Sequence, residues 1–167
     1  MGVKEHKKHA AKVVVAAVLT VSDTRTRRTD VTGKTIRDEL IKMGHKVIRQ
    51  GIVKDERREI RAWVKAALSD VRLHAIIING GTGLAKRDVT IEAVRPLLAK
   101  EADGFGEIFR MLSYKTIKSA AIMSRAIAGV AKRKIVFCIP GSPDAAKLAL
   151  KELILPELGH IVWEIKR

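Results

Sequence analysis

The chain has 167 residues, of which 47% are hydrophobic and 31% charged, and its 33 basic and 18 acidic side chains give a net charge of +15. This length and composition indicate one globular domain and exclude a mainly disordered chain. No apolar run approaches the about 20 residues that a membrane span needs. A single cysteine, Cys138, excludes an internal disulfide, so we expect a cytoplasmic protein with a buried structural thiol.

The positive charge predicts anionic ligands such as nucleotides, phosphorylated metabolites or nucleic acid. Aromatic residues make up only 4% and the chain has no recognisable nucleic-acid-binding signature, so we expect no specific nucleic-acid partner. Gln50 and Asn79 are the only side-chain amides. Together with the dense charge, this scarcity is typical of a protein from a hot environment, so part of the charge excess reflects habitat.

Residues 1–11 form a basic segment that we interpret as a flexible tail, and residues 12–167 form the domain. Strands and helices then alternate. Continuous β-branched runs are typical of buried parallel strands, and apolar residues at helical spacing predict the helices. The predicted elements of this first half are strands over 12–21, 45–53 and 74–80 and helices over 34–44 and 57–71.

In the second half, a short helix over 91–102 is predicted to bend or break near Pro96. Residues 104–133 are irregular and predict a helix and a hairpin-like segment. The remaining predictions are a strand over 134–139, a turn over 140–143, a helix over 144–154 and an edge strand over 160–166. The alternation favours a layered α/β fold with a mostly parallel sheet.

Ligands of such sheets bind beyond the carboxyl ends of the strands. Four polar segments follow the predicted strands and are therefore expected on one rim: Ser22-Asp23-Thr24, residues 53–55, the loop from Gly80, and Pro140-Gly141-Ser142-Pro143.

The loop "GGTGLAKRDVT", residues 80–90, is the most informative of these segments. Its glycines permit positive φ and close approach of a ligand to the backbone, and Arg87 offers phosphate a planar set of donors. It is not a dinucleotide fingerprint, because Lys86 stands where the third glycine belongs. The "TGKT" at 32–35 is not a P-loop either, because Arg28 replaces the required earlier glycine.

Asp88 in this loop and Asp55 after the second strand each have two interpretations. Each carboxylate is placed to cap the helix that follows it. Alternatively, two carboxylates beside a phosphate cradle form a hard-oxygen site suited to Mg²⁺, which also binds the phosphates of the substrate.

Two other motifs also carry alternatives. Glu107 and Arg110 are i,i+3 neighbours on a predicted helix, where a surface ion pair is the simple account. Ser142 either caps the helix after it or helps to bind an oxyanion. The histidines show no ligand spacing, so a zinc site is not expected.

The segments "LTVSDTRT", "IVKDE", "INGGTGLAKRDVT", "GFGEIFRMLSY", "SRAIAGV" and "IPGSP" occur in this order over nearly the whole chain. In them the chain closely resembles the MoaB/Mog family of molybdenum-cofactor biosynthesis proteins, which includes the G domain of gephyrin. The resemblance implies a single-domain, doubly wound three-layer α/β sandwich that assembles as trimers or, in the MoaB branch, hexamers. It also implies adenylylation of molybdopterin with ATP and Mg²⁺, which releases pyrophosphate.

The resemblance further implies roles for residues that match the motifs of the family. Asp55 and Asp88 match its catalytic aspartates, which would also hold the metal. The implied nucleotide and phosphate ligands are Ser22, Asp23, Thr24, Gly80, Gly81, Thr82, Gly83 and Arg87. The implied pterin site comprises Gly104, Phe105, Gly106, Glu107, Arg110, Ser113, Pro140, Gly141, Ser142 and Pro143.

One departure is Ile91, where many relatives have proline. It removes a preorganised helix start with little expected chemical effect. The alternative within the family is a non-catalytic protein that binds molybdopterin as a scaffold.

Overall fold

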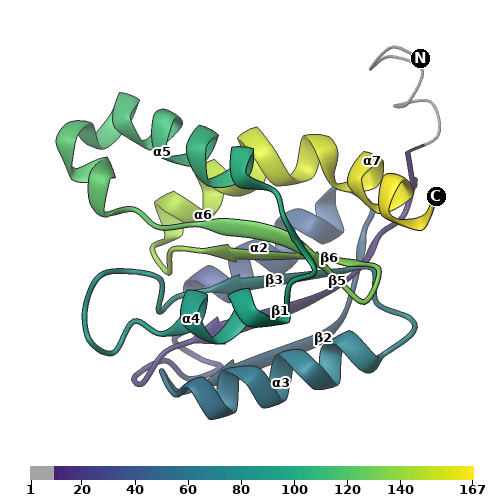
Figure 1. Ribbon diagram of the computed structural model, residues 1–167, viewed down its shortest axis with the longest axis horizontal. Helices are drawn as coiled ribbons and strands as arrows, with labels where there is room; N and C mark the ends of the chain where they lie inside the picture. The colour runs from purple at the N-terminus through teal and green to yellow at the C-terminus, as the bar shows by residue number, and fades with distance from the viewer. Residues whose placement is uncertain (1–9) are drawn as a thin grey trace.

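The computed structural model describes residues 10–167, and these form a six-stranded sheet covered by helices on both faces (Figure 1). The strand order is β2-β1-β3-β6-β5-β4. The first four of these strands are parallel, and β5 and β4 are antiparallel to their neighbours. The strands are β1 (Val15–Val21), β2 (Lys46–Val53), β3 (Ala75–Asn79), β4 (Lys100–Glu101), β5 (Ile127–Ala131) and β6 (Lys134–Ile139).

The helices are α2 (Val31–Lys42), α3 (Arg57–Ser69), α4 (Thr90–Val94), α5 (Asp103–Ile117), α6 (Pro143–Ala149) and α7 (Leu155–Lys166). Shorter turns are the 3-10 helices η1 (Arg95–Leu97) and η2 (Lys118–Met123) and the π-helix η3 (Leu150–Ile154). Within residues 10–167, no helix combines the length and apolar character that crossing a membrane requires.

Successive side chains of each buried strand point to opposite faces of the sheet. Because helices cover both faces, every side chain of such a strand is buried, which explains the continuous apolar runs. On β3, Ala75 and Ile77 pack under α2, α5, α6 and α7, whereas Ile76 and Ile78 pack against α3 and α4. Figure 1 shows α5 and α7 above the sheet and α3 and α4 below it. The predicted three-layer α/β sandwich is confirmed.

The predicted edge strand over 160–166 is wrong, because these residues belong to α7. The short apolar run looked like a strand in isolation. Together with the residues before it, it places Leu158 and Val162 four apart, and both are buried in the core below α7. This spacing is helical.

Two helix boundaries also differ from prediction. The helix expected from residue 34 begins at Val31, because Asp30 caps it by accepting from Gly33 N at 2.9 Å. The helix over 91–102 breaks near Pro96 as expected, but it ends at Val94, and residues 100–101 form β4 instead. There the backbone of Ala99 and Ala102 is bonded to that of β5, which draws the segment into the sheet.

The hairpin-like segment is confirmed: β5 and β6 join through Lys132 and Arg133, whose φ values of 45° and 59° suit a tight turn. Of the predicted tail, residues 1–9, with His6 and His9, lie outside the described residues. Ala11, which was also assigned to the tail, donates from its backbone N to Gly159 O at 3.0 Å.

Candidate functional site

The carboxyl ends of the four parallel strands meet at one rim of the sheet, as the sequence predicts. Backbone hydrogen bonds join the segments there: Ser22 N donates to Val53 O at 2.9 Å, and Gly80 N donates to Ile139 O at 3.1 Å. We call this edge the carboxyl rim and residues 80–90 the glycine loop.

The glycine loop approaches its neighbours too closely for any side chain at its start. Gly80 and Gly81 have φ values of +95° and +61°, and a Cβ on Gly80 would lie 2.2 Å from Val21 O. The buried Thr90 fastens the loop, donating from its hydroxyl to Gly80 O at 2.8 Å and from its backbone N to Gly81 O at 2.9 Å. Gly141 completes the rim, since a Cβ there would lie 3.0 Å from Gly80 Cα.

Asp55 does not cap α3, whose N-cap is Glu56 and has no side-chain cap bond. Its Oδ1 instead borders the glycine loop, 2.6 Å from where a Cβ on Gly81 would stand. Partial burial and the negative charges of Asp23 and Asp88 raise the pKa of the Asp55 carboxyl above its ordinary value.

Asp88 does not cap α4 either, because the N-cap is Val89. Its Oδ2 accepts from Ala85 N at 2.9 Å within the loop and lies 2.7 Å from where a Cβ on Gly83 would stand. The cap interpretation is therefore wrong for both aspartates. The structure brings Asp55 and Asp88 to the same glycine loop, close enough for their charges to interact.

This pair of carboxylates fits a Mg²⁺ ion that arrives with phosphate groups. Within residues 10–167, no three His, Cys, Asp or Glu side chains gather closely enough to form a complete protein-built metal site. Mg²⁺ needs no such cage, since it keeps waters and takes ligands from phosphates. Burial first, and then the negative charges of Asp23 and Asp88, raise the pKa of Asp55, and a bound cation would offset these effects.

Arg87, expected as a phosphate ligand, is held by two carboxylates. It donates to Asp23 Oδ2 from Nη2 at 2.6 Å and from Nε at 3.1 Å, and from Nη1 to Glu56 Oε1 at 3.0 Å. The bond from Arg87 lowers the pKa of Asp23. A guanidinium has five N–H groups, so one on each terminal nitrogen stays available to a phosphate.

Other predicted phosphate ligands build the rim. Ser22 Oγ accepts from the backbone N of Thr24 at 3.3 Å and of Arg25 at 3.2 Å, which shapes the loop after β1. Thr82 is buried. Ser142 caps α6 by accepting from Ala145 N at 3.2 Å, so its cap interpretation is confirmed.

The predicted pterin segment lies on α5 and divides into two groups. Gly106, Glu107 and Arg110 line a cavity of about 320 Å³, which we call the α5 cavity. Phe105 packs on Phe137 with ring centroids 5.2 Å apart. Buried Ser113 bonds to Phe109 O, and Gly104 lies exposed at the helix start.

Among the described residues, Glu107 and Arg110 do not form the ion pair that was the simple account of their spacing. Both side chains are thus available to a ligand in the α5 cavity. The residues Pro140, Gly141, Ser142 and Pro143 lie on the carboxyl rim and do not line this cavity.

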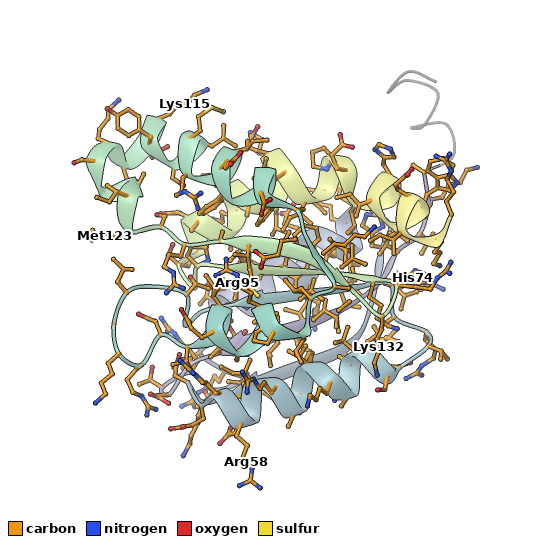
Figure 2. All side chains as sticks on the ribbon, in the orientation of Figure 1. Arg58, His74, Arg95, Lys115, Met123 and Lys132 are labelled. Carbon is orange, nitrogen blue, oxygen red and sulfur yellow. The ribbon has the colours of Figure 1, made fainter. Side chains whose placement is uncertain are left out.

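Sequence reasoning missed Arg125, which lines the α5 cavity and also holds the glycine loop. Its Nη1 donates to Gly83 O at 2.9 Å, and its Nη2 pairs with Glu92 on α4. Arg95, labelled in Figure 2, lines the same cavity and pairs with Glu101 at 2.8 Å. The segment "SRAIAGV" contains Arg125, but nothing in its spacing indicates which loop it would reach.

The mostly parallel sheet defines an α/β protein of the class whose ligands bind at the carboxyl ends of the strands, and its glycine loop and paired carboxylates lie at that edge. A family model described as "Probable molybdopterin binding domain" matches residues 17–160, and the chain belongs to this family.

Relatives with known names match this chain over nearly its whole length. Molybdenum cofactor biosynthesis protein B of Bacillus subtilis (strain 168) is 53% identical over 168 residues, covering 100% of this chain and 99% of its own. A crystal structure of a protein of the same name is 50% identical with a TM-score of 0.92, covering 95% of this chain and 99% of that chain. The tungsten cofactor synthesizing protein MoaB from Pyrococcus furiosus is 35% identical with a TM-score of 0.86, covering 95% of this chain and 100% of that chain.

Proposed function

We propose that the protein adenylylates molybdopterin, using ATP and Mg²⁺ and releasing pyrophosphate. One observation carries this proposal: Asp55 borders the glycine loop that contains Asp88, and neither carboxylate caps a helix. The membership in a molybdopterin-binding family and the names of the relatives support the choice of substrate.

In the proposed reaction, an oxygen of the terminal phosphate of molybdopterin forms a bond to the α-phosphorus of ATP. The bond from that phosphorus to the bridging oxygen of the β-phosphate breaks, and pyrophosphate leaves. The attacking phosphate is already ionised at neutral pH, so no general base is needed. The protein therefore contributes positioning and electrostatic stabilisation.

The carboxyl rim supplies the parts for this role. Asp55 and Asp88 would hold Mg²⁺, which neutralises charge on the phosphates when it is bound. The backbone N–H groups of the glycine loop and the remaining N–H groups of Arg87 would orient phosphate oxygens. The pairing of Arg87 with Asp23 and Glu56 fixes the guanidinium before the substrate arrives.

The α5 cavity suits the pterin ring by its polarity. Glu107 can accept from the amino group and ring N–H of a pterin, and Arg110 can donate to its carbonyl oxygen. Arg125 would keep this cavity and the glycine loop at a fixed separation.

The test is incubation with molybdopterin and MgATP, followed by detection of adenylylated product and pyrophosphate. We expect Asp88→Asn to lose turnover by at least about 10²-fold while it keeps its fold and pterin affinity, because the loss falls on charge stabilisation in the transition state. Asp38→Asn removes an exposed aspartate on α2 and is the matched control.

Near-normal AMP transfer by Asp88→Asn would refute the assignment of this residue. A wild-type protein that binds molybdopterin and forms no product would instead be the non-catalytic scaffold of the alternative.

A further inference from the structure

A second cavity, of about 660 Å³, shares no lining residue with the α5 cavity or the glycine loop. We call it the α2 cavity, because it is bounded by the first turns of α2, by the loop before that helix and by the edge strand β2. Its lining includes Arg27, Lys34, Arg37 and Asp30, with Gln50 and Gly51 on the strand side. None of these residues takes part in the proposed reaction.

The α2 cavity has an excess of positive charge. Its one carboxylate, Asp30, is 7% exposed and uses both oxygens inside the fold, accepting from Thr20 Oγ1 at 2.6 Å and from Gly33 N at 2.9 Å. Arg37 pairs with Asp38 at 3.1 Å. Among the described residues, Arg27 and Lys34 have no acidic partner, so their charges stay uncompensated.

The cations converge from separate elements. Lys34 and Arg37 are three apart and therefore lie on the same side of α2, while Arg27 comes from the preceding loop. On β2, a Cβ on Gly51 would point to the opposite face, 2.3 Å from Trp63 Nε1. Because side chains alternate along a strand, Gln50 faces the cavity.

The capture of an anion here would use side chains, because Asp30 already occupies the N–H of Gly33. A volume of this order is typical of small-molecule sites, which span about 300–1,000 Å³. Several convergent cations match a ligand with several adjacent negative charges better than a lone carboxylate.

We propose that the α2 cavity is a second anion site that binds the linked phosphate groups of a nucleoside triphosphate or an inorganic polyphosphate. This site is separate from the glycine loop and does not depend on the adenylylation reaction.

The chain provides its own reporters for the two sites. Gln50 and Asn79 are its only side-chain amides, so a ¹H–¹⁵N spectrum contains one NH₂ pair from each. Gln50 lines the α2 cavity, whereas Asn79 ends β3 directly before Gly80. Because Asn79 is also linked through Thr20 to Asp30 of the α2 cavity, the backbone amide of Gly83 serves as the second reporter of the glycine loop. A titration with tripolyphosphate, and a second with ATP, then reads the two sites separately.

We expect tripolyphosphate to shift the Gln50 NH₂ pair and the Gly51 amide saturably. The double variant Arg27→Gln/Lys34→Gln should weaken this binding by at least about tenfold, because it removes charge-assisted bonds. Arg58→Gln/Lys65→Gln removes the same charge from exposed positions on α3 and should change the affinity by less than about twofold.

A saturable shift of the Gln50 NH₂ pair with both ligands, or with ATP alone, supports the site. A difference in affinity between ATP and tripolyphosphate identifies a contribution of the nucleoside. Shifts confined to the Gly83 amide, shifts that never saturate, or equal weakening by the control variant would overturn the proposal.

Discussion

Arg125 Nη1 donates to the carbonyl oxygen of Gly83 at 2.9 Å and so joins the glycine loop to the α5 cavity. The same side chain pairs with Glu92 on α4. Burial is the largest single influence and acts to raise the pKa of Glu92, but the hydrogen bond and charge of Arg125, with a backbone hydrogen bond and the charge of Arg57, together lower it. One guanidinium thus sets the position of the loop relative to the cavity.

Arg125→Gln should lower kcat/KM for adenylylation by about ten- to hundredfold, because bonds from a charged donor each contribute about 1.5–3 kcal/mol. Arg125→Lys keeps the charge but cannot maintain both contacts, so its kcat/KM should lie between those of the wild type and of Arg125→Gln. Steady-state kinetics and thermal unfolding measure the effect, with Arg72→Lys, in an exposed ion pair with Asp70, as the control. An unchanged kcat/KM in Arg125→Gln would contradict the positioning role.

Asp55→Asn should stabilise the ligand-free protein at neutral pH while it removes activity. Burial and the charges of Asp23 and Asp88 raise the pKa of Asp55 above 3.8, so the folded state holds the proton more tightly than the unfolded state. The contribution that the protonated Asp55 makes to stability is fully present below pH 3.8, and it is lost as the pH rises through the raised pKa.

Calorimetry from pH 3.5 to 7 measures this effect, and each kcal/mol corresponds to about 2–4 °C in Tm for a chain of this size. The Tm difference between Asp55→Asn and wild type should vanish at the acid end, and Asp38→Asn should show none. A variant less stable than wild type at pH 7 would show that the carboxylate is not repelled there.

Gly81→Ala and Gly44→Ala separate backbone strain from site geometry. Both glycines have positive φ, +61° and +82°, which costs about 1–2 kcal/mol with any other residue. A Cβ on Gly44 meets no atom within 4 Å, whereas a Cβ on Gly81 would lie 2.5 Å from Thr90 Oγ1 and 2.6 Å from Asp55 Oδ1. We expect a similar loss of stability from strain in both variants, and a further loss of stability and of activity from the clash only in Gly81→Ala. Equal activity in both variants would contradict the close approach.

Exposed apolar side chains on α5 and η2 predict self-association, in agreement with the trimers or hexamers that the resemblance implies. They are Ile108, Met111, Tyr114, Ile117, Ile122 and Met123. Figure 2 labels Met123 at this end of the molecule. Exposed apolar residues that gather on neighbouring elements are typical of protein–protein interfaces.

Light scattering should give the mass of a trimer or hexamer for the wild type and a smaller mass for Met111→Glu/Ile122→Glu. Val71→Glu changes an exposed apolar residue away from the patch and should keep the assembly. A monomeric wild type would disprove this interface.

The sequence predicts the carboxyl rim well, because buried parallel strands read as continuous apolar runs and the polar residues after them must share an edge. It predicts α7 poorly, because the seven residues 160–166 taken alone fit a strand as well as two turns of a helix. The helical spacing becomes visible only when Leu158 is included. Only the structure could decide between the alternative roles of Asp55 and Asp88, because a helix cap and a metal ligand can stand at the same sequence position before a helix.

Long-range side-chain contacts were also beyond sequence reasoning. Arg87 lies 64 residues from its partner Asp23, and Arg125 lies 42 residues from Gly83. No local pattern encodes such pairs, since they depend on how the loops at the rim are folded together.

The Asn79–Gly80 bond bears on how the protein ages chemically. Asparagine before glycine deamidates readily when the glycine nitrogen can attack the side-chain carbonyl carbon. Here Gly80 N donates to Ile139 O at 3.1 Å, and Asn79 Nδ2 donates to Leu19 O at 3.1 Å and to Thr20 Oγ1 at 2.9 Å. In the native fold the Gly80 nitrogen and the Asn79 side-chain amide are each engaged in separate hydrogen bonds. Isoaspartate at this position would therefore form only in molecules that have opened locally or unfolded. The amount of isoaspartate would then measure how much time the molecules have spent in an open state.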